Sequence, residues 1–563
     1  MFGFNIIVNG KASSRQDDIC YNNIICQNLM IHKFEQDKLF INTDELIVLL
    51  DGVILNKKEL MKKSQIVNGG TWTDTVIELY RDKGERFFDV LRGSFAGALF
   101  DKERKKWIIF GDQLGTKYVY YTNVGGFFSC AEMCDVLYEN LRNNNIEYHL
   151  EHQNARLLLS YGFMVEDRTL CDKIKKIQPG CYLVYENGVI NEKRYYMLDN
   201  TPKDGFTEQE TIDKIDYYFR QAVIRQFEKD NEYGYKHIVA LSAGLDSRMT
   251  SFVAHDCGYT DQLNCTFSQT DYWDETVPKE MASYMKHEWL FKALDNGIWL
   301  KDVDEVTQLT GGNVAYYTIA HGNSLLKYIN FDQLGLSHTG QIGDSTISTN
   351  CRPNQKFEFG HGAYNEASIK IVNIKPKMEF ENAEIGFYYY RALSGANAGI
   401  QYLYNYTESL SPFLDLDFLE FALSIPWKYR HSHYIYHKWI IQKYPQAAQF
   451  VWEKIGCKIT DRTIELGGRI VPVKKVFAKT MARLGIYRNG GTNSIKNMNP
   501  YGYYMATNES LKPMLYQYFD YLEYINDDGL KVILQRIKES GKPIEILLAV
   551  SLLASVKKYY CNK

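Results

Sequence analysis

The 563-residue sequence lacks several features that would place it in a simple class. Its 11 cysteines stand singly, with neither a CxxC pair nor the Cys/His spacing of a zinc site, so we expect reduced thiols and no structural metal centre. It also lacks an excess of positive charge, because 65 Lys and Arg stand against 68 Asp and Glu. That balance predicts no nucleic-acid partner.

Long apolar runs and export signals are missing as well. The longest apolar run, ILLAVSLLASV at 546–556, is shorter than the roughly 20 residues that cross a bilayer, so it fits a buried helix. The opening MFGFNIIVNGKASS shows no basic leader followed by an apolar stretch. These absences predict a cytoplasmic protein with no membrane partner. No internal repeat or low-complexity tract is present.

The arrangement of apolar residues predicts two domains. In residues 1–195, short apolar runs such as ELIVLLDGVI and KWIIFGDQLG alternate with Gly pairs and Asn-Gly or Asp-Gly steps, which is typical of antiparallel strands joined by hairpins. Helical spacing interrupts the series at DTVIELYRDKG. We therefore predict a mostly antiparallel sheet domain with a few helices over 1–195.

The pattern changes after the Pro- and Gly-containing segment NTPKDGF, and a second domain is predicted over 205–563. A helix is expected first, then a strand at 237–242, a second helix, a strand at QLNCTFS, a helix at DETVPKEMASYMKHEW and a strand at QLGLSHTG. Such alternation predicts an α/β fold with a parallel sheet. From about 365 onward helical spacing dominates. The apolar face of the first helix is formed by Ile212, Ile215, Phe219, Ala222, Val223 and Phe227.

The stretch IVALSAGLDSR at 238–248 suggests an anion site at the end of the first parallel strand. A strand that enters a helix through a Gly-containing turn directs several free backbone N–H groups, and the helix dipole, at one place. Ser242 and Ser247 add hydroxyl donors, and Asp246 adds a carboxylate able to hold Mg²⁺. The alternative is an ordinary capped turn, since Asp and Ser are common N-cap residues.

SAGLDS resembles the pyrophosphate loop of the ATP pyrophosphatases (the PP-loop), usually SGGxDS, with Ala243 in place of the first glycine. Further along, SHTGQIGDS at 337–345 resembles the SGEGxDE loop of asparagine synthetases. SPFLDLDFLEFALSIP at 411–426 resembles their PFLD segment, and WEKIGCK at 452–458 resembles their lysine loop. Four motifs in the family order are far more specific than one short Gly motif.

The first domain shows the matching resemblance. LLDGVILNKKEL, LRGSFAGALFD, GDQLGTKYVYY and SCAEMCDVL are similar to successive segments of the family's class II amidotransferase domain. The resemblance implies an N-terminal-nucleophile (Ntn) hydrolase-like β-sandwich, which releases ammonia from glutamine in the family. It implies a second, ATP-pyrophosphatase domain with a helical C-terminal extension.

The glutamine site departs from the family pattern. The family needs a cysteine after the initiator Met as nucleophile, and this sequence has Phe2. Asp51 stands at the position of the oxyanion-hole asparagine, where an acid opposes the developing negative charge. Gly52 and Asp74 do match family binding positions. We therefore predict a vestigial glutamine site and a first domain without glutaminase activity.

In the second domain the resemblance implies ATP and Mg²⁺ as ligands. It assigns Asp246 and Asp344 to the metal and Lys454 to the charge of the departing pyrophosphate, which suits adenylation of a carboxylate. The residues expected to bind ATP or pyrophosphate are Leu241, Ser242, Ala243, Gly244, Leu245, Asp246, Ser247, Thr339 and Gly340.

The acceptor chemistry is less complete. Gln341 replaces the glutamate of the SGEG motif, which the resemblance assigns to stabilising the intermediate or removing a proton from the amine. An amide cannot accept that proton at pH 7. Another base serves, the amine arrives unprotonated, or the second half-reaction is impaired. His321, in the TGGNVAYYTIAHGN segment near the expected acceptor pocket, is a candidate base, although a lone histidine is more often a packed bystander.

The predicted function is that of an asparagine synthetase-like carbon–nitrogen ligase that converts ATP to AMP and pyrophosphate. The expected partners are a small-molecule or peptide carboxylate and an amine or ammonia, and a homodimer is possible. One alternative is an amide-forming cyclase or tailoring enzyme resembling β-lactam synthetases or lasso-peptide cyclases. The other, from a different class, is a nucleotide-binding regulator that has lost ligation.

Overall fold

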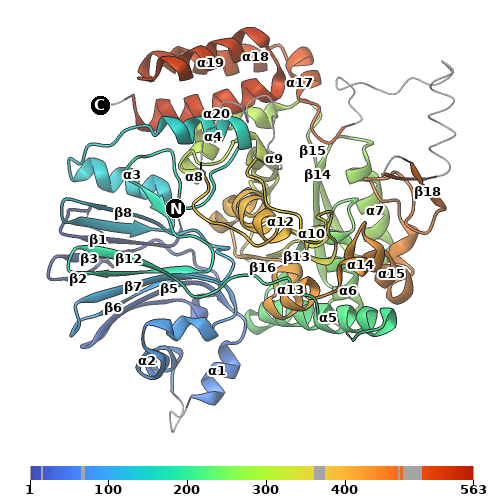
Figure 1. Ribbon diagram of the computed structural model, residues 1–563, viewed down its shortest axis with the longest axis horizontal. Helices are drawn as coiled ribbons and strands as arrows, with labels where there is room; N and C mark the ends of the chain where they lie inside the picture. Colours follow the sequence, from blue (N-terminus) through green and yellow to red (C-terminus); the bar gives the residue numbers. More distant parts are fainter. Residues whose placement is uncertain are drawn as a thin grey trace.

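The computed structural model describes residues 2–13, 15, 17–64, 70–203, 205–360, 375–466, 469–472 and 497–561. Figure 1 shows two antiparallel sheets at one side, a parallel sheet with its helices at the other, and a group of C-terminal helices across the top. The predicted order of an antiparallel β-sandwich, a parallel α/β sheet and a helical extension is confirmed.

The sandwich consists of two six-stranded sheets. Every residue of β5 is buried, because the two sides of this strand face different cores. Val48 and Leu50 pack toward α2, whereas Ile47 and Leu49 pack toward the other sheet. The first sheet has the order β10 (Lys175–Lys176), β8 (Tyr120–Val124), β9 (Phe127–Ala131), β1 (Phe4–Val8), β3 (Ile24–Asn28) and β2 (Ile19–Tyr21). The second has the order β12 (Val189–Arg194), β11 (Cys181–Glu186), β7 (Lys106–Gly111), β6 (Gly93–Asp101), β5 (Leu46–Ile54) and β4 (Leu39–Asn42).

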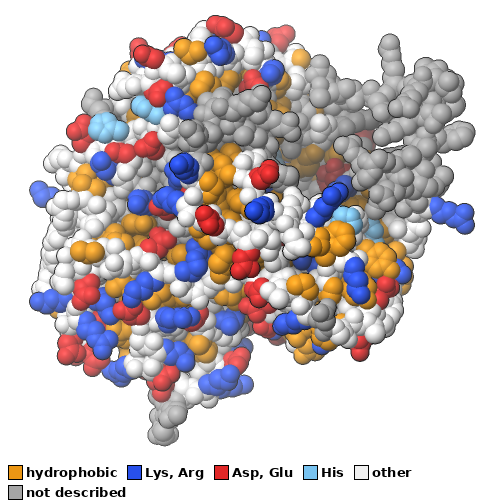
Figure 2. All heavy atoms as spheres, in the orientation of Figure 1, with side chains coloured by type: hydrophobic (Ala, Val, Ile, Leu, Met, Phe, Trp, Pro, Cys, Tyr) orange, Lys and Arg blue, Asp and Glu red, His pale blue; other side chains and the backbone are white. Residues whose placement is uncertain are grey.

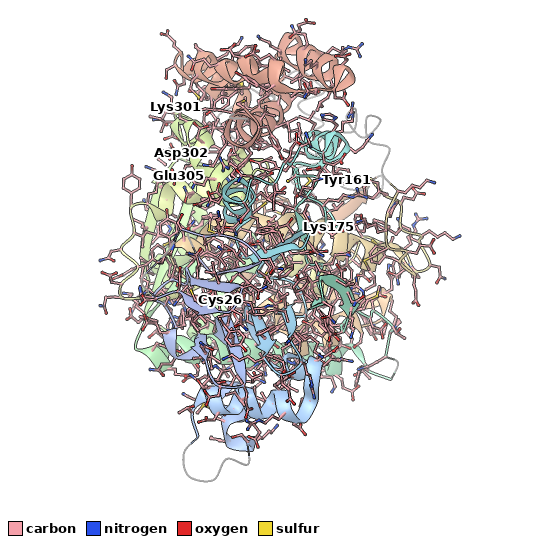
Figure 3. The ribbon with its side chains drawn as sticks, turned by 90° about the vertical axis from the view of Figure 1, so that its left-hand side faces the viewer. Cys26, Tyr161, Lys175, Lys301, Asp302 and Glu305 are labelled. Carbon is pink, nitrogen blue, oxygen red and sulfur yellow. The ribbon has the colours of Figure 1, made fainter. Side chains whose placement is uncertain are left out.

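Helices cover both outer faces of the sandwich. The helix predicted at DTVIELYRDKG is α2, which begins at a capping box formed by Thr71 and Asp74. Cys26, on β3, lies within the sandwich core (Figure 3), and the 11 cysteines are all free thiols in the described structure. The helical elements up to residue 200 are η1 (Glu35–Asp37), α1 (Lys57–Lys63), α2 (Trp72–Lys83), η2 (Gly84–Val90), α3 (Cys134–Asn143) and α4 (His152–Tyr161).

The second sheet system is parallel, with the strand order β15 (Glu288–Ala293), β14 (Gln262–Ser268), β13 (Lys236–Ala240), β16 (Leu334–His338) and β17 (Ser409–Leu410). Helices α5 (Glu208–Tyr233), α6 (Asp246–Asp256) and α7 (Trp273–Met285) pack beside it (Figure 1). The predicted apolar face of α5 is confirmed, because all six of its residues are buried. The strand predicted at 237–242 ends earlier, at Ala240, and the helix predicted through HEW ends at Met285, where β15 soon follows.

Between β15 and the C-terminal extension, the described residues outside β16 and β17 are mostly helical, in line with the helical spacing from about 365 onward. The exception is a hairpin of β18 (Thr463–Leu466) and β19 (Arg469–Pro472). The elements are η3 (Ile298–Lys301), α8 (Val303–Thr310), α9 (Tyr317–Leu326), α10 (Gly343–Ile347), α12 (Ala383–Phe387), the π-helical η4 (Tyr388–Ala396), η5 (Asn397–Asn405), η6 (Pro412–Leu414), α13 (Leu416–Leu423), α14 (Trp427–Arg430), α15 (Tyr434–Lys443) and η7 (Ala447–Gln449).

The C-terminal extension is formed by α17 (Tyr501–Thr507), α18 (Leu511–Gln517), η8 (Tyr518–Tyr524), α19 (Asp528–Ser540) and α20 (Pro543–Tyr559). The apolar run at 546–556 lies in α20 and is fully buried, as the sequence predicts. Tyr559 stacks on Tyr138 of α3 with ring centroids 3.9 Å apart, so the extension also packs on the first domain. Among the described helices, none combines the length and the apolar character needed to cross a membrane.

Candidate active site

A cavity of about 570 Å³ opens at the carboxyl ends of the parallel strands. The carboxyl edge of a parallel sheet is the usual place for a ligand in an α/β fold. We call it the strand-end cavity. Its wall includes the loop after β13, the loop after β16, and residues of α9, η5 and the lysine loop, among them Ser242, Asp246, Thr339, His321 and Glu453.

The loop from Leu241 to Leu245 is held in shape by its own hydroxyl groups. The Ser242 backbone N–H donates to Ser247 Oγ at 2.9 Å, and the two serine hydroxyls are 2.8 Å apart. The Gly244 N–H donates to Ser242 Oγ at 3.2 Å, and the Ala243 N–H donates to Asp274 Oδ1 at 2.8 Å. The turn therefore curls around the start of α6.

Two aspartates and one lysine from distant parts of the chain meet beside this loop. The Asp344 N–H donates to Asp246 Oδ2 at 2.9 Å, and Tyr436 donates its hydroxyl to Asp246 Oδ1 at 2.9 Å. Lys454 Nζ lies 3.8 Å from Asp344 Oδ2. The structure thus brings together the three residues that the motifs assign to one site, although Asp246 and Lys454 are more than 200 positions apart in the sequence.

A glycine allows the two acidic loops to approach. A Cβ atom at Gly340 would lie 2.2 Å from the backbone nitrogen of Ser247, far inside van der Waals contact. Any larger residue at 340 therefore separates the loop after β16 from the start of α6. The Thr250 hydroxyl donates to the Thr339 carbonyl at 3.2 Å and fixes the same junction.

The electrostatics of this edge favour a bound cation. Burial, and after it the nearby Asp344 carboxylate, raise the pKa of Asp246 to about 7. Burial also raises the pKa of Asp274 to about 6. Carboxylates whose negative charge is opposed by burial and by a like charge gain from a divalent cation, and carboxylate oxygen is the ligand type that Mg²⁺ prefers. Asp246 and Asp344 therefore fit a magnesium ion.

The two candidates for acceptor chemistry, Gln341 and His321, also line the strand-end cavity. The Gln341 side-chain N–H donates to the Ala396 carbonyl, and the Gln341 backbone carbonyl accepts from Ser411 Oγ at 3.0 Å. His321 packs against Phe267 and Trp299, and burial lowers its pKa to about 4. Its ring is therefore neutral at pH 7.

The position of the predicted glutamine site is filled by the chain itself. Phe2 is buried with its ring 5.8 Å from that of Tyr404, and its N–H donates to the sulfur of Met133 at 3.3 Å. The aromatic ring of Tyr404 comes from η5 of the second domain. Space for a substrate beside residue 2 is thus occupied by packed side chains.

Asp51 lies in a buried cluster of charges. Its Oδ1 is 2.9 Å from Lys38 Nζ, its Oδ2 pairs with Lys117, and both lysines also pair with Glu408 of the second domain at 2.9 and 3.2 Å. Burial alone would raise the pKa of Asp51, but Lys117 and Lys38 outweigh burial and hold it below its usual value. Lys117 is also 3.5 Å from Glu132, whose pKa burial and Asp51 raise.

The remaining residues of the predicted glutamine site separate from one another. Gly52 stays beside Asp51 in β5, paired with Phe95 across the sheet. Asp74 is exposed at the start of α2 and accepts from the N–H and hydroxyl of Thr71 at 2.8 and 2.7 Å. Its observed interactions are those of a helix cap rather than of the cluster around Asp51.

Several site residues were not predicted from the sequence. Asp274, Tyr436 and Glu453 surround the same loop, and the Glu453 carboxylate accepts from the Tyr272 hydroxyl at 2.7 Å. A signal for Asp274 was available, because it follows the strand QLNCTFS and so belongs to the same sheet edge as Asp246. No local pattern distinguishes Tyr436 from the other 42 tyrosines.

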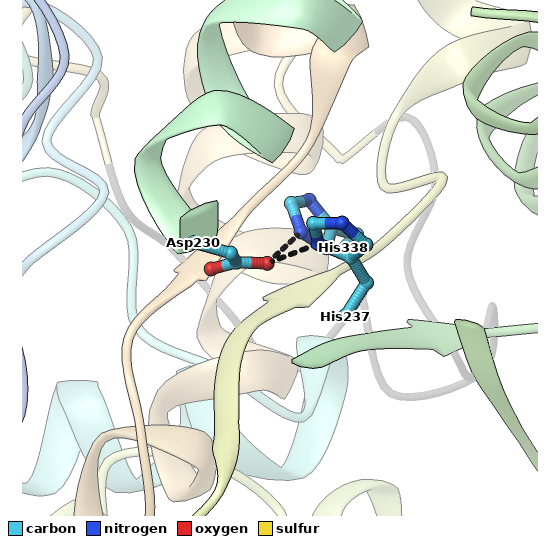
Figure 4. Close-up of side chains that lie close together, drawn as sticks. All are labelled: Asp230, His237 and His338. Carbon is cyan, nitrogen blue, oxygen red and sulfur yellow. Dashed lines mark hydrogen bonds and ion pairs between the residues drawn. The ribbon is translucent and has the colours of Figure 1, made fainter. Parts of the chain in front are cut away.

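A second cluster of titratable groups lies on the same sheet but outside the strand-end cavity. His237 Nδ1 and His338 Nε2 each donate to Asp230 Oδ2 at 2.8 Å (Figure 4). The Leu336 N–H donates to Asp230 Oδ1 at 2.7 Å. Asp230 thereby connects the end of α5 to β13 and β16. This is the only group of three potential metal ligands within 4.8 Å of one another in the described residues, and the 2.8 Å separations are those of hydrogen bonds.

Comparison with known proteins finds relatives among amidotransferases and asparagine synthetases. A family model described as a glutamine amidotransferase domain matches residues 31–196. The chain is 24% identical over 271 residues to the glutamine-hydrolyzing asparagine synthetase 1 of Bacillus subtilis, covering 46% of this chain and 40% of that protein. It is 23% identical over 356 residues to asparagine synthetase 3 of the same organism, covering 62% and 55%.

The chain is also similar to a protein whose name gives a different activity, amidase chyE of Penicillium rubens. The two are 27% identical over 205 residues, covering 36% of this chain and 29% of that protein. The chain thus spans about half of the length, or less, of the curated relatives it matches. Together these matches confirm the resemblance to the asparagine synthetase family. They support an enzyme of amidotransferase or ligase type.

Proposed function

We propose that this chain is an ATP-dependent carbon–nitrogen ligase. In the proposed reaction a carboxylate oxygen attacks the α-phosphorus of ATP and pyrophosphate leaves, and an amine or ammonia then attacks the acyl carbon and AMP leaves. The observation that carries the proposal is the meeting of Asp246, Asp344 and Lys454 at the mouth of β13, beside a cavity of about 570 Å³.

Each part of the cavity edge has a proposed task. The Ser242 and Ser247 hydroxyls bind phosphate oxygens at the start of α6. The loop N–H groups, which here donate within the loop and to Asp274, turn to the phosphate when it binds. Asp246 and Asp344 would hold Mg²⁺, which supplies charge neutralisation on the polyphosphate when bound. Lys454, which is half exposed beside Asp344, moves its ammonium onto the departing pyrophosphate.

Gln341 orients rather than accepts a proton in this proposal. Its side-chain N–H donates to the Ala396 carbonyl, and its backbone carbonyl accepts from Ser411 Oγ. The side chain therefore offers hydrogen bonds at the cavity wall but no base. His321 is a neutral acceptor in the same cavity, although a pKa of about 4 makes it a weak base. The amine therefore gives up its ammonium proton to solvent before it attacks the acyl carbon, and solvent also takes the second proton that the nitrogen loses when the amide forms.

We also propose that the first domain releases no ammonia from glutamine. Phe2 offers no nucleophile, and its ring packs against Tyr404 where the substrate would have to enter. Lys38 and Lys117 neutralise Asp51 internally, which leaves that position without a free group for a glutamine molecule. An amine supplied from solution is the nitrogen source that remains.

Pyrophosphate exchange into ATP tests this function with the purified full chain. Pools of carboxylates are supplied with Mg-ATP, and hydroxylamine traps any acyl-adenylate as a hydroxamate. The expected result is exchange that depends on one acid and falls at least 100-fold in both Asp246→Ala and Asp344→Ala, because each variant loses a metal carboxylate. Asp256→Ala, at the exposed end of α6, is the matched control.

The same assay separates the alternatives. ATP binding without exchange for any acid would select the nucleotide-binding regulator, and undiminished exchange in both aspartate variants would refute the metal assignment. A cyclase or tailoring enzyme would show exchange only with the acid of a larger substrate.

A further inference from the structure

A second and larger cavity lies where the two predicted domains meet. Its volume is about 930 Å³, and we call it the interdomain cavity. One side is formed by residues of α1, α2 and η2 and by the turn after β7. The other side is formed by α5, η5, η6 and the start of α13. Its size is within the range of small-molecule sites, roughly 300–1,000 Å³.

The interdomain cavity adjoins the strand-end cavity. Thr339, Gln341 and Ile400 line both. Gln341, the residue that replaces the acidic group of the family motif, therefore stands at the boundary between the proposed nucleotide site and this second space. A molecule held in the interdomain cavity lies next to the place where the proposed acyl-adenylate forms.

The wall of the interdomain cavity contains hydrogen-bond acceptors that have no donor. Asn397 is fully buried, and its Nδ2 donates to the Gly115 and Thr116 carbonyls at 3.4 and 3.2 Å, which leaves its Oδ1 unpaired. Gln226, 1% exposed, also has a buried Oε1 without a partner, as does Glu78 at Oε2. A buried acceptor without a donor costs roughly 1–3 kcal/mol, so a ligand that donates hydrogen bonds is favoured here.

Charge indicates the same class of ligand. Seven acidic and four basic side chains line the interdomain cavity. Three of the bases, Lys63, Lys83 and Arg225, already pair with cavity carboxylates at 2.6, 3.5 and 2.5 Å. The wall is thus rich in negative charge and in carbonyl acceptors, a combination that suits an ammonium group and disfavours an anion.

We propose that the interdomain cavity binds the amine that is joined to the activated acid, and that this amine is a primary amine with a carbon body rather than ammonia. The inference rests on the proposed ligase function. A molecule the size of water needs only about 30 Å³, so a site of about 930 Å³ is far larger than ammonia requires. Because the glutamine site is filled, such an amine enters from solution.

Isothermal titration calorimetry on the full chain tests the proposal without any turnover. The probe is n-butylamine, which is protonated at pH 7. Sodium butyrate is the anion of matched shape, and ammonium chloride is the control for size. The expected result is that butylammonium binds the wild-type chain and that butyrate and ammonium bind at least ten-fold more weakly.

Two variants locate the site. Leu414→Trp fills the wall of the interdomain cavity, and Gln226→Leu removes one unpaired carbonyl at nearly constant volume. Each is expected to weaken butylammonium binding at least ten-fold. Val532→Trp, on the exposed face of α19, is the matched control and should leave binding unchanged. Circular dichroism will show whether Leu414→Trp folds. If it does not fold, Gln226→Leu still tests the proposal.

Failure of this inference differs from failure of the ligase proposal. The amine site would be overturned by any of three results: no binding of butylammonium, equal binding of butyrate, or butylammonium binding that neither cavity variant weakens. Pyrophosphate exchange, measured on the wild-type chain from the same preparations, reports the ligase proposal alone. Binding of butylammonium with no exchange for any acid would keep the site and refute the ligase.

Discussion

Asp246 serves the proposed chemistry at a cost to the stability of the free protein. Burial and Asp344 raise its pKa to about 7, whereas an unfolded chain ionises an aspartate near pH 4. Between these values the folded state binds the proton more tightly, so the free energy of unfolding falls as pH rises from about 4 to 7 and is constant above. The ionised carboxylate at pH 8 is therefore destabilising until a cation binds.

Asp246→Asn should consequently stabilise the nucleotide-free protein while abolishing exchange. We expect its melting temperature to exceed that of the wild type by a few degrees at pH 8 and by clearly less at pH 5. Thermal unfolding at both pH values in EDTA measures the difference. Asp44→Asn, exposed in the turn between β4 and β5, is a suitable control, and a difference that does not grow with pH would contradict the assigned pKa shift.

The residues at the carboxyl edge of the parallel sheet can be predicted from the sequence, because they belong to short motifs. Asp246, Asp344 and Lys454 were named from the sequence, and the structure brings them within reach of one another. The buried charges could not be predicted in the same way. Lys38, Lys117 and Glu408 have the hydropathy of surface residues, and only pairing across as many as 370 positions allows their burial.

The parallel sheet depends on a connection that lies away from the cavity. Asp230, at the end of α5, receives hydrogen bonds from His237 on β13, His338 on β16 and the Leu336 N–H. All three side chains are buried, and the His338 ring stacks on Phe227 with centroids 3.7 Å apart. One carboxylate thus fixes a helix to the two central strands.

Asp230→Ala should lower the free energy of unfolding by about 3 kcal/mol, because it leaves three buried donors unpaired. Urea denaturation followed by tryptophan fluorescence measures the change. Removal of Asp256, which pairs with Arg220 near the surface, should cost less than about 1 kcal/mol. Equal losses for the two variants would show that the cluster contributes no more than an exposed ion pair.

Helices and strands with a clear pattern of apolar residues can be predicted from this sequence, whereas short or half-exposed strands cannot. The face of α5 and the strand β14 match the sequence pattern closely. The helix predicted through HEW takes in the first two residues of β15, because the residues of this strand are mostly half-buried and show no alternation. β17 has two residues and exists only by pairing with β16, so no local signal specifies it.

The two predicted domains are held together in part by charge. Glu408, in the second domain, is 1% exposed and pairs with Lys38 and Lys117 of the first. Glu408→Ala should therefore leave two buried lysines with Asp51 as their nearest anion and lower the free energy of unfolding by about 3 kcal/mol. Urea denaturation measures the loss, and Glu45→Ala, exposed beside Arg81, should change the free energy of unfolding by less than about 0.5 kcal/mol. A similar value for both variants would contradict this account.

Helices α1, α2 and η2 form part of the wall of the interdomain cavity, so the first domain shapes the proposed amine site without any reaction of its own. On this proposal, natural selection acts on the shape that these helices present to the second domain. Replacements around Phe2 should be tolerated among descendants of this gene as long as the packing survives. Replacements that reshape the cavity wall should be eliminated, because they remove the surface that the proposed amine contacts.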